Sequence, residues 1–239
     1  MKQAIYAAQV NSVERLGHDV DRVFLQLDHP VVFAAGQYLE IEVTPDSWSA
    51  FSIACAPGSS QLELHIQYLP GREKSEQLFA RLHPGNTLNL RLPAGKCFLQ
   101  GADRPLMLVA AGTGFAQIKA MIEALWQQNW QSPVTFYWAS KNRIGLYDLE
   151  LAESWAKQHN NFHLIPLLEL ADAQWTGRVG RITDVLAADF AAADSAAKVQ
   201  GYISGSPAMV YVVEDLLISR GMLPGALQSD VHAYAPRNL

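Results

Sequence analysis

A pair of glycines follows directly on an apolar run and opens a segment with helical spacing. The run from Leu106 to Ala111 leads into Gly112-Thr113-Gly114. A short continuous apolar run bounded by glycines predicts a strand that is buried on both faces. Apolar side chains then recur at helical intervals, at Phe115, Ile118, Met121, Ile122, Leu125 and Trp126. A helix N-terminus offers free N–H groups to a phosphate, and glycine permits close approach. The stretch predicts a nucleotide-binding turn, although Gly-x-Gly alone also fits an ordinary connection.

The other residue types that could carry chemistry are scattered. His65, Asp148 and His163 form no metal or catalytic-triad pattern. Cys55 and Cys97 lack the spacing of a metal site and do not make a disulfide framework. We therefore expect both thiols to be reduced and packed, as in a cytosolic protein. Two cysteines also fall short of the four ligands that an iron–sulfur cluster needs.

Length and charge limit the function classes. At ~100–200 residues per domain, the 239 residues allow one large domain or two small ones. The net charge of −5 leaves no basic footprint for nucleic acid. No apolar run approaches the ~20 residues of a membrane span, and residues 1–9 lack the apolar core of a signal peptide. We expect a cytoplasmic protein without a membrane span.

The first hundred residues alternate between apolar and polar side chains. Leu39, Ile41 and Val43 alternate with two glutamates, and the same period recurs over residues 23–27, 62–66 and 88–92. Turn signals separate these runs at residues 28–30, 57–58, 70–71 and 83–85. The pattern predicts an antiparallel sandwich or barrel. One helix is predicted from Lys74-Ser75-Glu76 to Leu82, ended by Pro84-Gly85.

The pattern changes after residues 100–103. Apolar strands are predicted at 106–111, 134–138, 162–168 and 199–204, with helices to about 129, over 148–159, within 182–190 and over 207–220. Ser206 suits the N-cap of the last helix, Pro207 its first position and Gly221 its end. This alternation predicts a parallel sheet with helices on both faces and ligands at the carboxyl ends of the strands. We expect two domains, 1–101 and 102–239, with a linker near Gly101.

Six motifs follow one another in a characteristic order. They are Gly36-Gln37-Tyr38, Ser49-Ala50-Phe51-Ser52, Gly95-x-x-Phe98, Arg104-Pro105-Leu106 with Ala111-Gly112-Thr113-Gly114-Phe115, Tyr137-Trp138-Ala139-Ser140 with Leu146-Tyr147, and Ser204-Gly205-Ser206-Pro207-x-Met209. Over nearly the whole length, this series resembles the ferredoxin–NADP reductase superfamily, above all its compact bacterial NAD(P)H–flavin reductases. The resemblance implies an N-terminal antiparallel Greek-key β-barrel that binds flavin, followed by a Rossmann-like α/β domain that binds NAD(P)H.

The same resemblance assigns a flavin site in the barrel. Ser52 matches the serine whose hydroxyl faces flavin N5 and is the expected catalytic residue, while Phe51 would lie along the flavin and Tyr38 near it. Ser49 stands where the family has an arginine that holds the flavin phosphate. We therefore expect weakened flavin binding. Arg72 or Lys74, with Ser75 in a segment close to the family's Gly-x-x-Ser, could take over the phosphate.

In the second domain, the resemblance assigns the nicotinamide side of the dinucleotide to Gly112, Thr113 and Gly114. Lys141 and Arg143 follow the second strand, where relatives place an arginine near the adenosine ribose or its 2′-phosphate; an exposed charged loop is the other interpretation. Near the nicotinamide, Ser204 replaces the family's cysteine and Pro207 follows it. Tyr234 resembles a terminal aromatic that covers the flavin.

The implied activity is hydride transfer from NADH or NADPH to FMN, FAD or riboflavin, with the flavin loosely bound as a substrate. Two alternatives remain open at this stage. The protein could keep its flavin and pass electrons to a partner, such as a flavin-dependent monooxygenase, another oxygenase or an iron–sulfur protein. It could also be a binding protein that has kept the fold and lost turnover. The serine at position 49, in place of the family's arginine, is the reason to consider this alternative.

Overall fold

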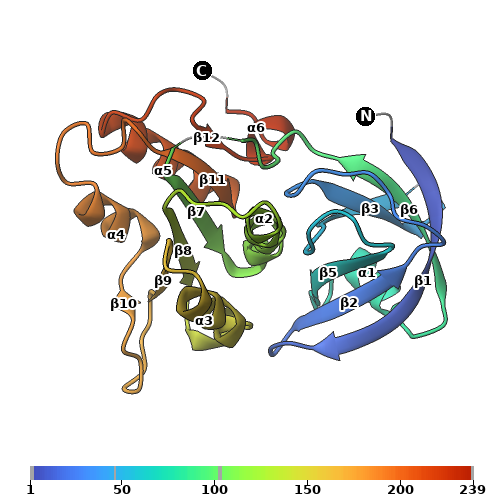
Figure 1. The fold of residues 1–239 in the computed structure, drawn as a ribbon. Helices are drawn as coiled ribbons and strands as arrows, with labels where there is room; N and C mark the ends of the chain where they lie inside the picture. The colour runs from blue at the N-terminus through green and yellow to red at the C-terminus, as the bar shows by residue number, and fades with distance from the viewer. Residues whose placement is uncertain (1–2, 46, 102–103, 238–239) are drawn as a thin grey trace. The chain divides into compact units, whose positions relative to one another are not determined.

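The computed structural model describes residues 3–45, 47–101 and 104–237. The chain forms two compact units, of which the first holds Met1–Leu99 with Lys119–Asn129 and the second holds Gln100–Ile118 with Trp130–Leu239. Each unit is built around one six-stranded sheet (Figure 1). The domain boundary expected at 101/102 adjoins residues 102–103, which lie outside the described residues.

The first unit contains an antiparallel barrel. Its elements are β1 (Ala4–Arg15), β2 (Val20–Gln26), β3 (Tyr38–Thr44), β4 (Ser47–Ser52), β5 (Gln61–Gln67), α1 (Glu73–Phe79) and β6 (Thr87–Ala94). The strand order is β4-β3-β6-β1-β2-β5, and every pairing is antiparallel. The outermost strands approach one another where Ile53, just beyond β4, bridges to Leu64 of β5. The predicted barrel is thereby confirmed.

The alternation in the sequence explains why these strands form a barrel. Leu39, Ile41 and Val43 of β3 are buried in one apolar cluster with residues from β1, β2, β5 and β6. Because successive side chains of a strand point to opposite faces, Tyr38 and Glu40, on either side of Leu39, lie on the outer face. The predicted helix is present as α1, but it ends at Phe79, before the predicted stop.

The second unit contains a parallel sheet. Its strands are β7 (Leu106–Ala111), β8 (Val134–Ser140), β9 (Phe162–Leu168), β10 (Arg178–Val179), β11 (Gln200–Ser204) and β12 (Leu227–Gln228). The helices are α2 (Phe115–Gln127), which extends into the first unit, α3 (Leu149–Gln158), α4 (Ile182–Asp189), α5 (Pro207–Ser219) and α6 (Val231–Tyr234). The order is β10-β9-β8-β7-β11-β12, with parallel pairing throughout. No helix in the described part of the chain is long and apolar enough to cross a membrane.

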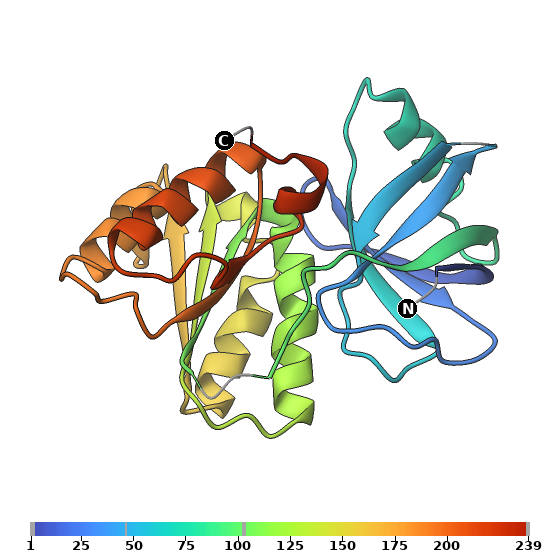
Figure 2. The ribbon, with the colours of Figure 1, turned by 90° about the horizontal axis from the view of Figure 1, so that it is seen from above.

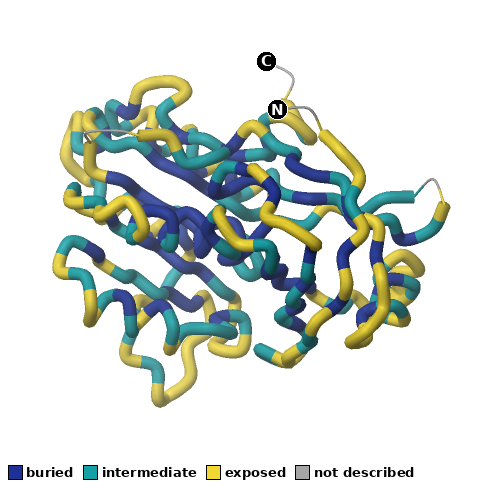
Figure 3. Tube along the Cα trace, turned by 45° about the vertical axis from the view of Figure 1, so that its right-hand side comes forward, coloured by how far each residue is buried: buried dark blue, intermediate teal, exposed yellow. Residues whose placement is uncertain are grey.

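Both faces of this sheet are covered. Met107 and Val109 of β7 pack in one apolar cluster with residues of α4 and α5. On the other face, Phe115 at the start of α2 stacks on Trp138 with 4.0 Å between ring centroids, and Trp155 of α3 lies 6.1 Å from Phe115. Figure 2 shows α3 on one side of the sheet and α4 and α5 on the other. The central strands are consequently buried along most of their length, as the dark blue segments of Figure 3 show.

The turn after β7 lies against the end of β11. A Cβ on Gly114 would collide with the carbonyl oxygen of Ser204 and lie 2.8 Å from its carbonyl carbon. Since both obstacles are backbone atoms, no side-chain rotation can relieve the contact. Only glycine therefore fits between the turn and β11.

We expect Gly114→Ala to lower the free energy of unfolding by about 1–3 kcal/mol, the usual range for overpacking. The control is Gly101→Ala, because nothing lies within 4 Å of a Cβ at Gly101. Urea unfolding monitored by circular dichroism measures both variants. Equal midpoints for the two variants would show that the contact with Ser204 is not a constraint.

Candidate functional site

A pocket of about 450 Å³ lies at the carboxyl ends of the parallel strands. Its walls come from the end of β7, the end of β8 with Lys141, the residue after β9, which is Glu169, and the first residues of α4 and α5. All of these residues belong to the second unit. Parallel α/β sheets bind ligands at this edge, so the pocket lies where the strand pattern predicted a ligand.

Two helix N-termini border the pocket. Ile182 and Thr183 begin α4, and Ser206 is the N-cap of α5, where its hydroxyl accepts a hydrogen bond from the Met209 N–H at 3.4 Å. The predicted N-cap of α5 is thus confirmed. Each N-terminus carries a partial positive charge and N–H groups without partners inside the helix. The arrangement suits the phosphate groups of a nucleotide.

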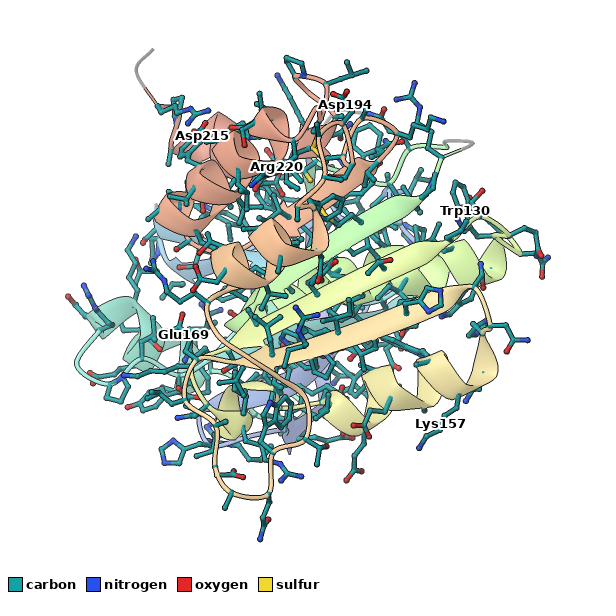
Figure 4. All side chains as sticks on the ribbon, turned by 90° about the vertical axis from the view of Figure 1, so that its left-hand side faces the viewer. Trp130, Lys157, Glu169, Asp194, Asp215 and Arg220 are labelled. Atoms are coloured by element: carbon teal, nitrogen blue, oxygen red, sulfur yellow. The ribbon has the colours of Figure 1, made fainter. Side chains whose placement is uncertain are left out.

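Charged side chains of both signs add to the partial positive charges of the two helix N-termini. Lys141 and Arg181 line the pocket and are positive, whereas Glu169 lines it and is negative. Glu169 comes directly after β9 and is labelled in Figure 4. Arg143, the second residue expected near the adenosine ribose, is exposed and does not line the pocket. The balance favours an anionic ligand and places one carboxylate beside it.

The glycine turn that first indicated a nucleotide site is held by an aromatic side chain. Gly112–Gly114 forms a 3₁₀ turn, in which Gly112 has a φ of 53° and lines the pocket. The Trp138 indole N–H donates to the Gly112 carbonyl at 3.3 Å. Because Phe115 stacks on the same indole, Trp138 fixes both ends of the turn. Ser204 is brought against Gly114, and Pro207 occupies the first turn of α5.

The candidate flavin residues of the barrel lie on two faces of β4. Ser52 is the Cα partner of Tyr38 on β3, so these two side chains share the outer face. Phe51 pairs with Leu39 and packs against the barrel core, and Ser49 pairs with Ile41 on the same inner face. Since β4 is an edge strand of the sheet, a ligand lying along that edge can contact residues of both faces.

The segment expected to replace the missing arginine is α1 with the residues before it. The Ser75 hydroxyl accepts from the Leu69 N–H at 2.9 Å, and the Glu76 carboxylate accepts from the Gly71 N–H at 3.0 Å. Glu73 and Glu76 place two negative charges in the first turn of this seven-residue helix, beside the exposed Lys74. These charges and local bonds oppose phosphate binding at α1.

Tyr234 ends the short helix α6 and is 65% exposed. The turn before α6 is tied to the start of α2, because the Gln117 side-chain amide donates to Asp230 at 2.9 Å. An exposed aromatic ring therefore stands at the end of α6.

Arg181 and Glu169 were not among the residues expected from the sequence. Arg181 directly precedes the helix predicted within 182–190, and Glu169 directly follows the strand predicted over 162–168. Glu169 holds the same kind of position as Lys141, directly after a strand of the parallel sheet, and this position is the signal that could have indicated it. Arg181 is brought into the pocket by the loop after β9, for which the sequence contains no comparable signal.

Comparison with known proteins agrees with this geometry. Residues 7–98 match the family described as Oxidoreductase FAD-binding domain, and residues 108–215 match Oxidoreductase NAD-binding domain. The chain is 30% identical over 204 residues to an NAD(P)H-flavin reductase of Aliivibrio fischeri, covering 82% of this chain and 85% of that protein. A solved cytochrome P450 reductase of Amycolatopsis superposes with a TM-score of 0.85 at 28% identity, over 95% of this chain and 69% of that one.

Protein RfbI of Salmonella typhimurium is 32% identical over 210 residues, which make up 86% of this chain. The match spans 62% of the length of RfbI.

The charges of the pocket lead to a prediction for NADPH and NADH, of which only NADPH carries the 2′-phosphate. We expect Glu169→Gln to tighten NADPH binding and Lys141→Gln to weaken it, each by about fivefold, as for a screened charge pair worth about 1 kcal/mol. NADH binding should change little. Quenching of tryptophan fluorescence gives the dissociation constants of both nucleotides. Arg143→Gln is the control and should change neither; equal shifts for the two nucleotides would exclude contact with the 2′-phosphate.

Proposed function

Because the chain belongs to the ferredoxin–NADP reductase superfamily, we propose that it reduces free flavin with NADH or NADPH, with the flavin as an exchangeable substrate. Membership of the family makes the protein an NAD(P)H-dependent flavin oxidoreductase. The proposal concerns what happens to the reduced flavin, which would leave as the product.

The observation that carries the proposal is the chemistry around the expected flavin phosphate. Ser49 supplies no positive charge, and its side chain lies on the inner face of β4 with Ile41. The first turn of α1 adds Glu73 and Glu76. An arginine fork contributes charged hydrogen bonds of roughly 1.5–3 kcal/mol each, so its absence should loosen FMN and FAD but not riboflavin. A flavin held through its ring alone exchanges readily.

In this proposal, nicotinamide and flavin supply the hydride chemistry, and the protein supplies position and hydrogen bonds. The Ser52 hydroxyl, which shares the outer face of β4 with Tyr38, would donate a hydrogen bond to flavin N5, and Phe51 would lie along the flavin. A hydroxyl suits this position because it can donate or accept as N5 changes protonation. The nucleotide phosphates bind at the N-termini of α4 and α5. Gly112, Thr113, Gly114, Ser204 and Pro207 would receive the nicotinamide side of the dinucleotide.

A second candidate function is electron transfer to a protein partner. It is favoured by the likeness to a cytochrome P450 reductase, which is longer than this chain. The two functions differ in where the flavin stays. Purified protein that remains yellow after gel filtration would favour electron transfer, whereas colourless protein that oxidises NADH only with added flavin would favour flavin reduction. Colourless protein with no such activity would indicate a binding protein without turnover.

Ser49→Arg should restore the charge that the flavin phosphate lacks. We expect FMN to bind about 10- to 100-fold more tightly, the equivalent of ~1.5–3 kcal/mol for one charged hydrogen bond, with riboflavin little changed. Flavin fluorescence titration gives both constants. Ala50→Arg is the matched control, because it adds the same charge to the opposite face of the same strand. Nanomolar FMN affinity in the wild type, or equal tightening of both flavins, would contradict the proposal.

Ser52→Ala removes the proposed donor and little volume. A donor used mainly in the transition state lowers kcat and kcat/KM together, and we expect losses of roughly ten- to a hundredfold, at ~1.4 kcal/mol per factor of ten. Steady-state NADH oxidation with riboflavin measures this, after circular dichroism has shown native secondary structure. Ser52→Thr keeps the hydroxyl and should retain most of the activity. Full activity in folded Ser52→Ala would remove Ser52 from the mechanism.

A further inference from the structure

The backbone that follows Ser52 is held within the first unit by several hydrogen bonds. The Ile53 N–H donates to the Gln37 carbonyl at 3.1 Å, and the Ala54 N–H donates to the Glu63 carbonyl at 2.7 Å. Ile53 and Ala54 are both buried. The segment from Ser52 to Ala56 therefore leaves β4 along a path with little freedom.

Two side chains of α2 add hydrogen bonds to the same backbone segment. The Lys119 ammonium donates to the Ala54 carbonyl at 2.9 Å, and the Glu123 carboxylate accepts from the Ala56 N–H at 3.1 Å. Lys119 and Glu123 are one helical turn apart and bind each other at 2.6 Å. Residues 119–129 and 1–99 form one compact unit, so all of these bonds lie inside it.

The same lysine belongs to a buried set of charges. Its ammonium lies 2.8 Å from the Glu63 carboxylate, which also meets the His65 ring at 2.8 Å and Arg22 at 3.3 Å. The side chains of Lys119 and Glu63 are 4% and 10% exposed. Burial would lower the pKa of Lys119, but the charges of Glu63 and Glu123 outweigh it and raise that pKa. Burial lowers the pKa of His65, so its ring is neutral and donates to Glu63. Lys119 thus stays charged.

Stability alone does not account for this arrangement. Removing two charges from water is costly, and replacement of a buried ion pair by apolar side chains of similar volume is often neutral or stabilising. What apolar side chains could not provide is a directed donor for the Ala54 carbonyl and an acceptor for the Ala56 N–H. The buried charges are thus coupled to the geometry of one short backbone segment.

We propose that Lys119 and Glu123 are positioning residues, which clamp the backbone at Ala54 and Ala56 and thereby fix Ser52 for its contact with flavin. The inference rests on the proposed function, because it assigns the clamp a purpose in hydride transfer. Ser52 lies only two residues before Ala54. A shift of the backbone at Ala54 would therefore also move the Ser52 hydroxyl. A misplacement of about 1 Å in an active site can reduce the rate by about a hundredfold.

The first test measures the clamp without using activity. The variant Glu63→Gln with Lys119→Met removes the buried pair together and leaves no unbalanced buried charge between them. Hydrogen exchange of the Ala54 and Ala56 amides should become at least about tenfold faster, since local opening governs this rate. The matched control is Asp21→Asn with Arg15→Met, which removes a partly buried ion pair between β1 and β2 and should leave both amides unchanged. If the first variant is not folded by circular dichroism, Glu123→Ala tests the Ala56 amide.

The second test asks whether the clamp acts through Ser52. In the wild type and in the control background, Ser52→Ala should lower kcat by the same factor. In the Glu63→Gln, Lys119→Met background, kcat should already be about tenfold lower, and Ser52→Ala should add less than about a threefold loss, because coupled residues are not additive. If Lys119 and Glu63 had a merely structural role, Ser52→Ala would lower kcat by the same factor in every background.

The outcomes separate this inference from the proposed function. Unchanged exchange of both amides, or independent losses from the two sets of substitutions in an active enzyme, would overturn the clamp and leave flavin reduction standing. A wild type that does not reduce flavin with NADH would overturn the proposed function, and the catalytic purpose of the clamp with it. Faster exchange combined with a diminished Ser52→Ala effect would support both.

Discussion

The close approach of two backbones, at Gly114 and Ser204, is the constraint on which the pocket of the second unit depends. The turn after β7 can reach the end of β11 only because Gly114 carries no side chain. Trp138 then holds the turn from the other side through the Gly112 carbonyl, and Phe115 stacks on the same ring. With the turn fixed in this way, the carboxyl ends of β7 and β8 and the N-termini of α4 and α5 border one pocket. A bulkier residue at position 114 would shift the wall of that pocket.

The two units differ in the way they can recognise a phosphorylated ligand. The pocket of the second unit combines two helix N-termini with Lys141 and Arg181, which is the chemistry of a phosphate site. In the barrel, Ser49 supplies no charge, and the first turn of α1 is acidic. A dinucleotide would consequently be bound through its phosphates, whereas a flavin would be bound through its ring. This asymmetry fits an enzyme that exchanges its flavin.

Charged side chains are also buried inside the barrel unit. Lys119, Glu63 and Glu123 form a mostly buried set of opposite charges whose remaining hydrogen bonds go to the backbone at Ala54 and Ala56. A buried salt bridge is weak evidence for a contribution to stability, but its charged hydrogen bonds fix the orientation of the groups that they join. In our interpretation, its value lies in the rigidity that it gives to the end of β4.

The sequence alone determined the order and type of most elements. Period-two alternation at Leu39, Ile41 and Val43 indicates a strand with one buried face, and the apolar run 106–111 indicates a strand with two buried faces. Both can be read from the sequence because successive side chains of a strand alternate between its two faces. The signal over β1 is weak, because its buried positions are Ala8 and Val10 alone. The elements β10, β12 and α6 are too short for a periodic signal. The motifs likewise indicated Ser52, Lys141 and the glycine turn.

Which of these residues come into contact depends on tertiary packing. It brought Arg181 and Glu169 into the pocket and left Arg143 outside, because loop paths depend on packing rather than on a local pattern. It showed that the groups around Ser75 are already bonded locally, and it placed Lys119 of α2 on the Ala54 carbonyl, 65 residues away in the chain. In the sequence, Lys119 is simply a lysine in an apolar helix. Its burial, and hence the role that we propose for it, arises from contacts between segments far apart in the chain, which no spacing along the chain can specify.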